Sequence, residues 1–174
     1  MATWKVDASH TNVGFAVRHM MVSKVRGRFT EFEGSLNGNP EDLTGATIEF
    51  TIDAASIDTD NKDRDDHLRS ADFFEVEKYP NITFKSTNIV KNGDKYEITG
   101  DMTIKGITKS VTFDAEFLGS GKNPWGVEVA AFEANTKISR KEFGLTWNQT
   151  LEAGGVLVSD DIEITLELQL NPEA

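Results

Sequence analysis

The chain has 174 residues and a mass of 19.3 kDa, with 38% hydrophobic and 27% charged residues, which excludes an intrinsically disordered protein. A formal net charge of −11 disfavours non-specific binding to nucleic acid, although basic residues cluster at Lys24, Arg26 and Arg28. Because cysteine is absent, disulfides, thiolate nucleophiles and cysteine-ligated metals are excluded. We expect one acidic domain over residues 1–174 that binds no nucleic acid.

The amino-terminal residues lack the features of an export signal. The opening MATWKVDASH has neither a basic region nor an apolar core, and residues 3–7 already alternate like a strand. No stretch of the chain reaches the apolar length that a membrane span needs. The sequence therefore predicts a cytoplasmic protein without stable membrane insertion.

Two further segments with strand-like alternation are residues 12–19 and 25–33. Gly27, inside the second segment, predicts a bulge or the close approach of another chain. In residues 12–19, the alternation places four side chains on one face: Val13, Phe15, Val17 and His19.

Residues 47–53 alternate cleanly between apolar and polar side chains, which is typical of an antiparallel strand with one face in water. Over residues 57–84 this alternation stops, and a charged, helix-like segment replaces it. Asp58 or Thr59 could cap a helix near residues 61–70. The pattern predicts a short helical insert that caps or braces the sheet.

The second half of the chain returns to alternating strands. Asn92-Gly93 predicts a hairpin turn, but a strict two-residue turn would place Phe84 and Ile98 on opposite faces. We therefore expect an extra loop residue or a bulge in this hairpin.

The last strands are expected over residues 110–118, 125–137 and 159–170. The third alternates without a single error. In the second, the side chains alternate from Trp125 through Val129 to Ala131, and the phase then slips. In all, about eight or nine strands have one apolar face and no helical layer to cover it. Closing the sheet into an antiparallel barrel buries that face and removes both edges.

The sequence contains no recognisable catalytic motif. Asp63 and His67 lie four residues apart and could share a metal, but a solvated helix face with internal ion pairs explains them better. His19 shares a face with Phe15 and could meet the head of a ligand, or could be a hydrogen-bonded histidine at the barrel rim. The 11 phenylalanines fit either a filled core or an aromatic cavity, and periodicity does not separate the two.

Four segments resemble the YceI-like family of bacterial lipid-binding proteins. They are DASHTNVGFAVRHMMVSKVRGRF, SIDTDNKDRDDHLRSADFFEVEKYPNITF, GDMTIKGITKSV and ISRKEFGL; they occur in the family's order and together span most of the chain. The resemblance implies an extended lipocalin-like fold, an eight-stranded antiparallel barrel with a helical insert. It also implies an internal apolar tunnel that holds a long-chain isoprenoid or a similar lipid.

The resemblance carries over a set of polar positions, most of which we expect to lock the insert onto the barrel end. These are His10, Arg18, His19, Arg64, Asp65, His67 and Arg140. The tunnel itself, with its mouth, is expected to be lined by Phe15, Val17, Arg18, His19, Phe50, Phe84, Phe113 and Val129.

The resulting hypothesis is a non-enzymatic carrier or store of a polyisoprenoid, a quinone or an isoprenoid pyrophosphate. No cofactor or metal is expected, and the expected partner is the lipid. The chain could also form a homodimer. One alternative is an enzyme that acts on a lipid or its head group, with His19 or His67 as general base. The other is a filled, ligand-free scaffold with a role in stress response.

Overall fold

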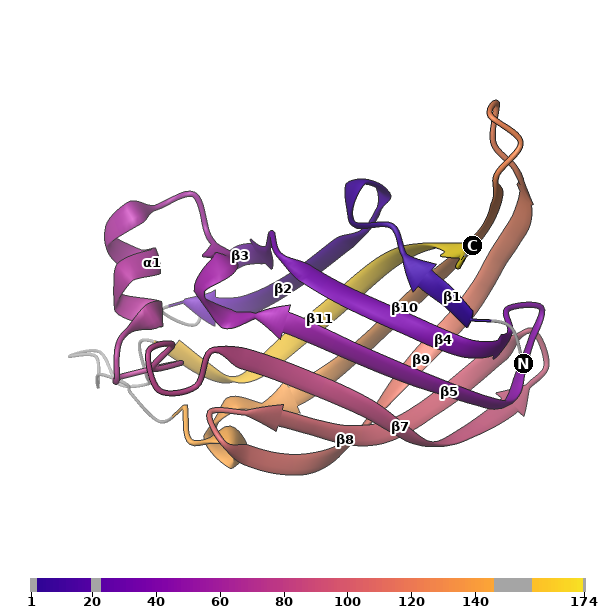
Figure 1. Cartoon of the computed structure of the whole chain (residues 1–174). Coiled ribbons are helices and arrows are strands. Elements are labelled where there is room, and N and C mark those ends of the chain that lie inside the picture. Colours follow the sequence, from indigo (N-terminus) through magenta and orange to yellow (C-terminus); the bar gives the residue numbers. More distant parts are fainter. Residues whose placement is uncertain (1–2, 20–22, 146–157, 174) are drawn as a thin grey trace.

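The computed structural model describes residues 3–19, 23–145 and 158–173, which form a barrel of long antiparallel strands with one α-helix across an end (Figure 1). The strands are β1 (Thr3–Val6), β2 (Asn12–His19), β3 (Ser23–Phe29), β4 (Phe32–Asn39), β5 (Asp42–Asp53), β6 (Ile57–Asp58), β7 (Asn81–Asn92), β8 (Lys95–Ile104), β9 (Ile107–Lys122), β10 (Glu128–Ser139) and β11 (Val158–Pro172). The helices are α1 (Lys62–Arg69) and the 3-10 turns η1 (Ala8–His10), η2 (Ala54–Ser56) and η3 (Arg140–Phe143).

The sheet closes because β1 pairs with β4 on one side and with β11 on the other. Three long strands are each interrupted once, which divides them into β1 and β2, β3 and β4, and β5 and β6. Backbone hydrogen bonds from Thr30 to Ser56 and from Asp53 to Glu31 keep the wall continuous across the breaks. With each interrupted pair counted as one strand, the expected closed eight-stranded antiparallel barrel is confirmed.

Two of these breaks contain the same type of hydrogen bond between an aspartate side chain and the backbone. An Asp7 carboxylate oxygen accepts a hydrogen bond from the Ser9 amide, and an Asp53 carboxylate oxygen accepts one from the Ala55 amide, both at 3.0 Å. An aspartate that bonds the backbone two residues ahead offers the chain an alternative to the strand ladder. The strand therefore stops, and a 3-10 turn follows it.

The hairpin of β7 and β8 contains the predicted bulge. Asn92 pairs with Lys95 across a two-residue turn, and the register shifts further along, between Ser86 and Asn88. The shift lets both Phe84 and Ile98 point inward and be buried. It also places Val90 on the outer face, where the side chain is 46% exposed.

The expected strand over residues 125–137 needs a correction. β10 begins only at Glu128, and Trp125 lies in the preceding turn with 84% of its surface exposed. From Glu128 to its end, the side chains of β10 alternate between the two faces without interruption, with Ala130 and Phe132 inward and buried. The irregularity lies in β9, which carries one extra residue opposite the step from Ala131 to Phe132. Because β9 absorbs the shift, no phase slip occurs in β10.

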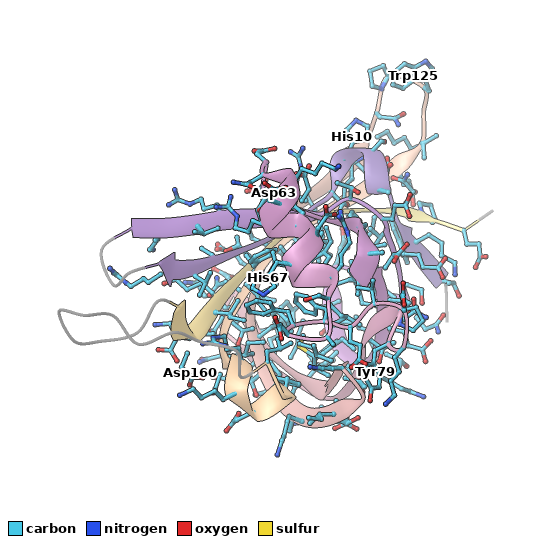
Figure 2. All side chains as sticks on the ribbon, turned by 90° about the vertical axis from the view of Figure 1, so that its left-hand side faces the viewer. His10, Asp63, His67, Tyr79, Trp125 and Asp160 are labelled. Atoms are coloured by element: carbon cyan, nitrogen blue, oxygen red, sulfur yellow. The ribbon has the colours of Figure 1, made fainter. Side chains whose placement is uncertain are left out.

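The predicted insert is present, and α1 lies across one end of the barrel (Figures 1 and 2). Its amino-terminal cap is Asn61, whose side-chain oxygen accepts a hydrogen bond from the Arg64 amide at 3.0 Å. The expected caps, Asp58 and Thr59, lie too early in the chain, and the Asp58 carboxylate bonds the Asp60 amide instead. Among the described helices, none has the length and apolar character needed to cross a membrane.

Candidate functional site

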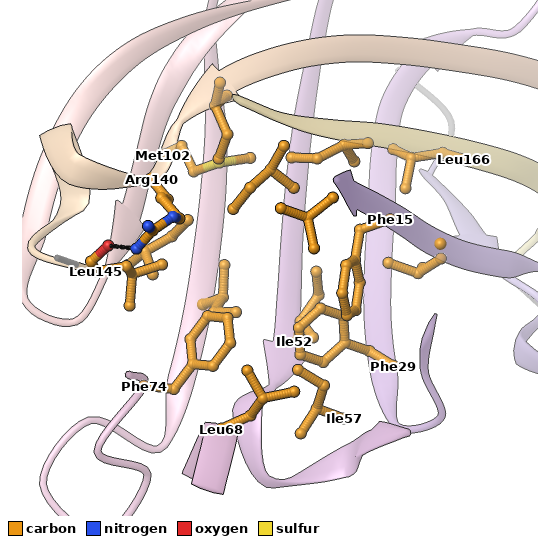
Figure 3. Close-up of a pocket in the computed structure, with 18 of the residues that line it drawn as sticks. Phe15, Phe29, Ile52, Ile57, Leu68, Phe74, Met102, Arg140, Leu145 and Leu166 are labelled. Atoms are coloured by element: carbon orange, nitrogen blue, oxygen red, sulfur yellow. Dashed lines mark hydrogen bonds between the residues drawn. The ribbon is translucent and has the colours of Figure 1, made fainter. Parts of the chain in front are cut away.

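The barrel encloses a cavity of about 550 Å³ (Figure 3). This volume lies in the range of about 300–1,000 Å³ that ligand pockets in proteins occupy. Inward-facing side chains of nearly every strand line it, and almost all are aliphatic or aromatic. Such a lining binds apolar groups by removing them from water and offers few polar atoms for orientation.

The side chains of β11 show how the interior is arranged. The strand alternates as predicted, yet the inward-facing Ile162, Ile164, Leu166 and Leu168 remain only half-buried. All four line the cavity, so their remaining exposure is exposure to this space. The interior along β11 is therefore hollow.

Most of the predicted lining residues lie on the cavity, and one does not. The residues that line it are Phe15, Val17, Arg18, Phe50, Phe84 and Phe113. Val129 was expected among them, but the single phase of β10 turns its side chain away from the interior, so this expectation is wrong. His19 lies in β2, and its side chain falls outside the described part of the structure, so its contact with a ligand remains a prediction.

Sequence reasoning missed the floor of the cavity, which the insert supplies. Ile57, Leu68 and Phe74 cover part of the α1 end of the cavity (Figure 3). The sequence does not point to Leu68 as a lining residue, because a single apolar residue on a charged helix gives no periodic signal. The available clue was its position next to the Phe73-Phe74 pair.

Polar side chains gather at the same end. Exposed residues such as Arg18, Asn61 and Asp63 belong to the lining, so the cavity reaches the surface between β2 and α1. Arg64 and His67 add two further polar groups from the helix. The cavity is thus apolar along its length and polar at this mouth.

A hydrogen-bond network holds the amino-terminal part of α1 in place. The Thr59 amide and hydroxyl both donate to one oxygen of the buried Asp65 carboxylate, at 2.9 and 2.5 Å. The Arg64 guanidinium donates to the Thr59 hydroxyl at 2.7 Å and to its carbonyl at 2.6 Å. These contacts give Arg64 and Asp65 a structural role in fixing the helix to the chain that enters it.

The two histidines with described side chains each face a carboxylate. In His67, Nε2 lies 2.9 Å from Asp72 rather than near Asp63, and the ring packs edge-on against Phe73. His10 lies 2.9 Å from Asp7 in η1, away from the insert. The described residues contain no group of three metal-ligating side chains. This geometry does not bring Asp63 and His67 together as a metal pair.

Arg140 lies in the cavity wall with only 2% of its surface exposed. Its guanidinium donates a hydrogen bond to the Leu145 carbonyl (Figure 3). Burial lowers the pKa of Arg140, and the Asp160 carboxylate acts in the opposite direction. A hydrogen bond from the Ser139 hydroxyl, at 2.6 Å, lowers the pKa of Asp160 and keeps it negatively charged. A buried positive charge therefore borders an otherwise apolar interior.

Comparison with known proteins gives a consistent result. The model of the YceI-like domain matches residues 4–170. A UPF0312 protein of Staphylococcus epidermidis is 42% identical over 164 residues, which cover 94% of each chain. Protein YceI of Escherichia coli O157:H7 is 41% identical over 146 residues, 83% of this chain and 76% of the relative.

Solved structures agree with the fold. BcnA of Burkholderia cenocepacia superimposes with a TM-score of 0.82 at 27% identity, covering 94% of this chain and 98% of that one. A polyisoprenoid binding domain from Saccharophagus degradans, implicated in plant cell wall breakdown, gives a TM-score of 0.71. That match covers 99% of this chain and all of the other, but at 12% identity it shows a shared fold alone.

Proposed function

The chain belongs to the YceI-like family, and we propose that it binds a long-chain apolar lipid in the barrel cavity as a carrier or store, without catalysis. The cavity of about 550 Å³ with its aliphatic and aromatic lining carries this proposal. Burying an alkyl chain contributes roughly 0.8 kcal/mol per methylene, so a long tail binds tightly without specific polar contacts. The match in fold to a domain described as polyisoprenoid binding adds support.

The ligand class that best fits is an isoprenoid chain with a small polar end, such as a polyisoprenoid, a quinone or an isoprenoid pyrophosphate. The chain would lie along Phe15, Phe50 and Leu166, and the polar end would lie at the mouth near Arg18. A cavity of this kind selects a ligand by length and girth more than by head group. The predicted lining residues thus remain our proposed contact residues, apart from Val129.

The decisive experiment is mass spectrometry of the purified protein, first in its native state and then after organic extraction. We expect one long-chain lipid per chain. Leu166→Gln, which introduces an amide into the cavity, should lower lipid retention, whereas Glu167→Gln on the outer face of the same strand should not. A protein that is empty and also refuses added isoprenoids and fatty acids would overturn the proposal.

A further inference from the structure

The hairpin of β2 and β3 departs from the acidic character of the rest of the chain. Residues 8–30 contain no Asp or Glu, although the whole chain has 29. The same stretch supplies Arg18, Lys24, Arg26 and Arg28. A positive surface on a protein of net charge −11 would orient the whole molecule in an external field.

The four basic side chains share one face, which we call the basic face. In the hairpin, Arg18 pairs with Lys24, while Arg26 and Arg28 stand opposite Ala16 and Gly14 on the outer side. Residues directly opposite in an antiparallel pair project to the same side of the sheet. All four are exposed, so their charges lie on the outer surface of the barrel.

In the described part of the chain, three acidic residues adjoin the basic face. Asp161 of β11 shares a small surface hollow with Arg18 and Lys24. Arg28 lies 3.3 Å from Asp58 of β6, and Lys24 lies 3.3 Å from Glu163 of β11. On the far side of Glu163, Lys137 of β10 adds a further positive charge. The four basic residues and Lys137 carry five positive charges against the three negative charges of Asp58, Asp161 and Glu163, so the face keeps a net positive charge.

The other side of this hairpin belongs to the cavity. Phe15, Val17 and Val25 project inward and line it, and Arg18 borders both the cavity mouth and the outer surface. In Figure 2, which faces the α1 end, β2 and β3 extend to the left of the helix. One hairpin thus joins the basic face to the mouth.

We propose that the basic face docks the barrel onto an anionic lipid bilayer, with the cavity mouth beside the bilayer surface. The inference rests on the proposed function and names where the lipid would enter or leave. An anionic surface attracts the basic face and repels the acidic remainder, so the mouth is turned toward the lipid source. Docking is peripheral and reversible, because the contact is electrostatic.

The test is co-sedimentation with vesicles of phosphatidylcholine mixed with phosphatidylglycerol, compared with vesicles of phosphatidylcholine alone. We expect the protein to sediment with the anionic vesicles at low salt and to be released at about 0.5 M salt, where charges are screened within a few ångströms. Each basic residue near such a surface contributes about fivefold in affinity, so Lys24→Gln with Arg26→Gln should weaken binding by about 25-fold.

The matched control is Lys91→Gln with Lys95→Gln, in the hairpin of β7 and β8. Both double variants change the net charge from −11 to −13, but only the first alters the basic face. Equal losses in the two variants, or equal sedimentation with neutral vesicles, would overturn the docking proposal. If the protein does not bind anionic vesicles but binds polyglutamate in a way that depends on Arg26, the docking proposal is overturned in favour of an acidic protein partner.

A separate readout keeps this proposal distinct from the proposed function. Lipid content after extraction should be unchanged in the Lys24→Gln, Arg26→Gln variant, because neither residue lines the cavity. Transfer of a fluorescent isoprenoid from anionic vesicles should slow in that variant alone. Normal transfer with lost sedimentation would overturn the docking role and leave the cavity proposal intact, whereas an empty cavity in every variant would overturn the proposed function.

Discussion

Two walls of the barrel have the same alternating pattern but different packing. In the wall of β7 to β10, the inward-facing rings of Phe84, Phe113 and Phe132 are buried, and the first two pack edge-on with ring centroids 5.2 Å apart. In the wall of β11, β2, β3 and β5, residues such as Phe15, Phe50 and Leu166 are only half-buried. Alternation therefore shows which side chains face inward, but not whether protein or open space meets them there.

The same truncation, Phe to Ala, should lower the free energy of unfolding by different amounts in the two walls. Phe113→Ala removes a ring that is 5% exposed and should lower the free energy of unfolding by about 3–5 kcal/mol. Phe50→Ala removes a half-buried ring and should cost only about 1–2 kcal/mol. Urea denaturation of the lipid-free proteins measures both values. Equal costs would show that the two walls are packed alike.

Glycines in the two walls provide a second comparison. A Cβ added to Gly100 of β8 would lie 2.4 Å from the Lys85 carbonyl oxygen, which belongs to the backbone and cannot move aside. A Cβ added to Gly27 of β3 would meet the Phe15 ring, which borders the cavity, at 2.4 Å and the Thr59 methyl group at 2.8 Å.

We therefore expect Gly100→Ala to cost about 3 kcal/mol of stability and Gly27→Ala less, because its contacts are with side-chain atoms and the Phe15 ring can rotate into the open space. Because the rotated Phe15 ring would occupy part of the cavity, the Gly27→Ala protein should hold less lipid. Denaturation and lipid content measured on both variants check this prediction, and a larger stability loss in Gly27→Ala would contradict it.

The floor of the hollow wall depends on polar contacts rather than on a packed core. Asp65→Ala leaves the Thr59 amide and hydroxyl without their carboxylate partner, which should cost about 2 kcal/mol. Hydrogen exchange should accelerate in α1 and not in β8. Lys62→Ala, at an exposed position of the same helix, is the control, and uniform acceleration across the barrel would argue against a locally held floor.

The smallest expected effect concerns the break between β1 and β2. Hydrogen bonds from Ser9 and then from His10 lower the pKa of Asp7 to about 2, below its usual value of about 3.9. Because the folded-state pKa is the lower one, the stabilisation is complete above about pH 4 and is lost as the pH falls toward 2. Asp7→Asn should therefore flatten the stability profile between these values, which acid titration of circular dichroism detects. Asp114→Asn, on the outside of β9, should leave the profile unchanged.

Much of the fold could be read from local patterns. The two-residue turn after Asn92 demanded a bulge, because Phe84 and Ile98 could not otherwise share a face, and the structure contains it. The helix was predicted within about one residue at each end, although its cap was misplaced. Val129 was misassigned because the bulge that sets its phase lies in the neighbouring strand, β9, so β10 itself carries no sign of it.

The sequence by itself determined most of the strands, most of the inward-facing side chains and the closure of the barrel, because apolar alternation without a covering layer has few other solutions. Only the tertiary structure decided that the interior is hollow, because cavity volume depends on the distance between opposite walls and on which side chains meet across it. It also decided that the charged insert supplies an apolar floor. Leu68 and Phe74 serve the cavity because Asp65, Arg64 and Arg69 hold the insert against the barrel end.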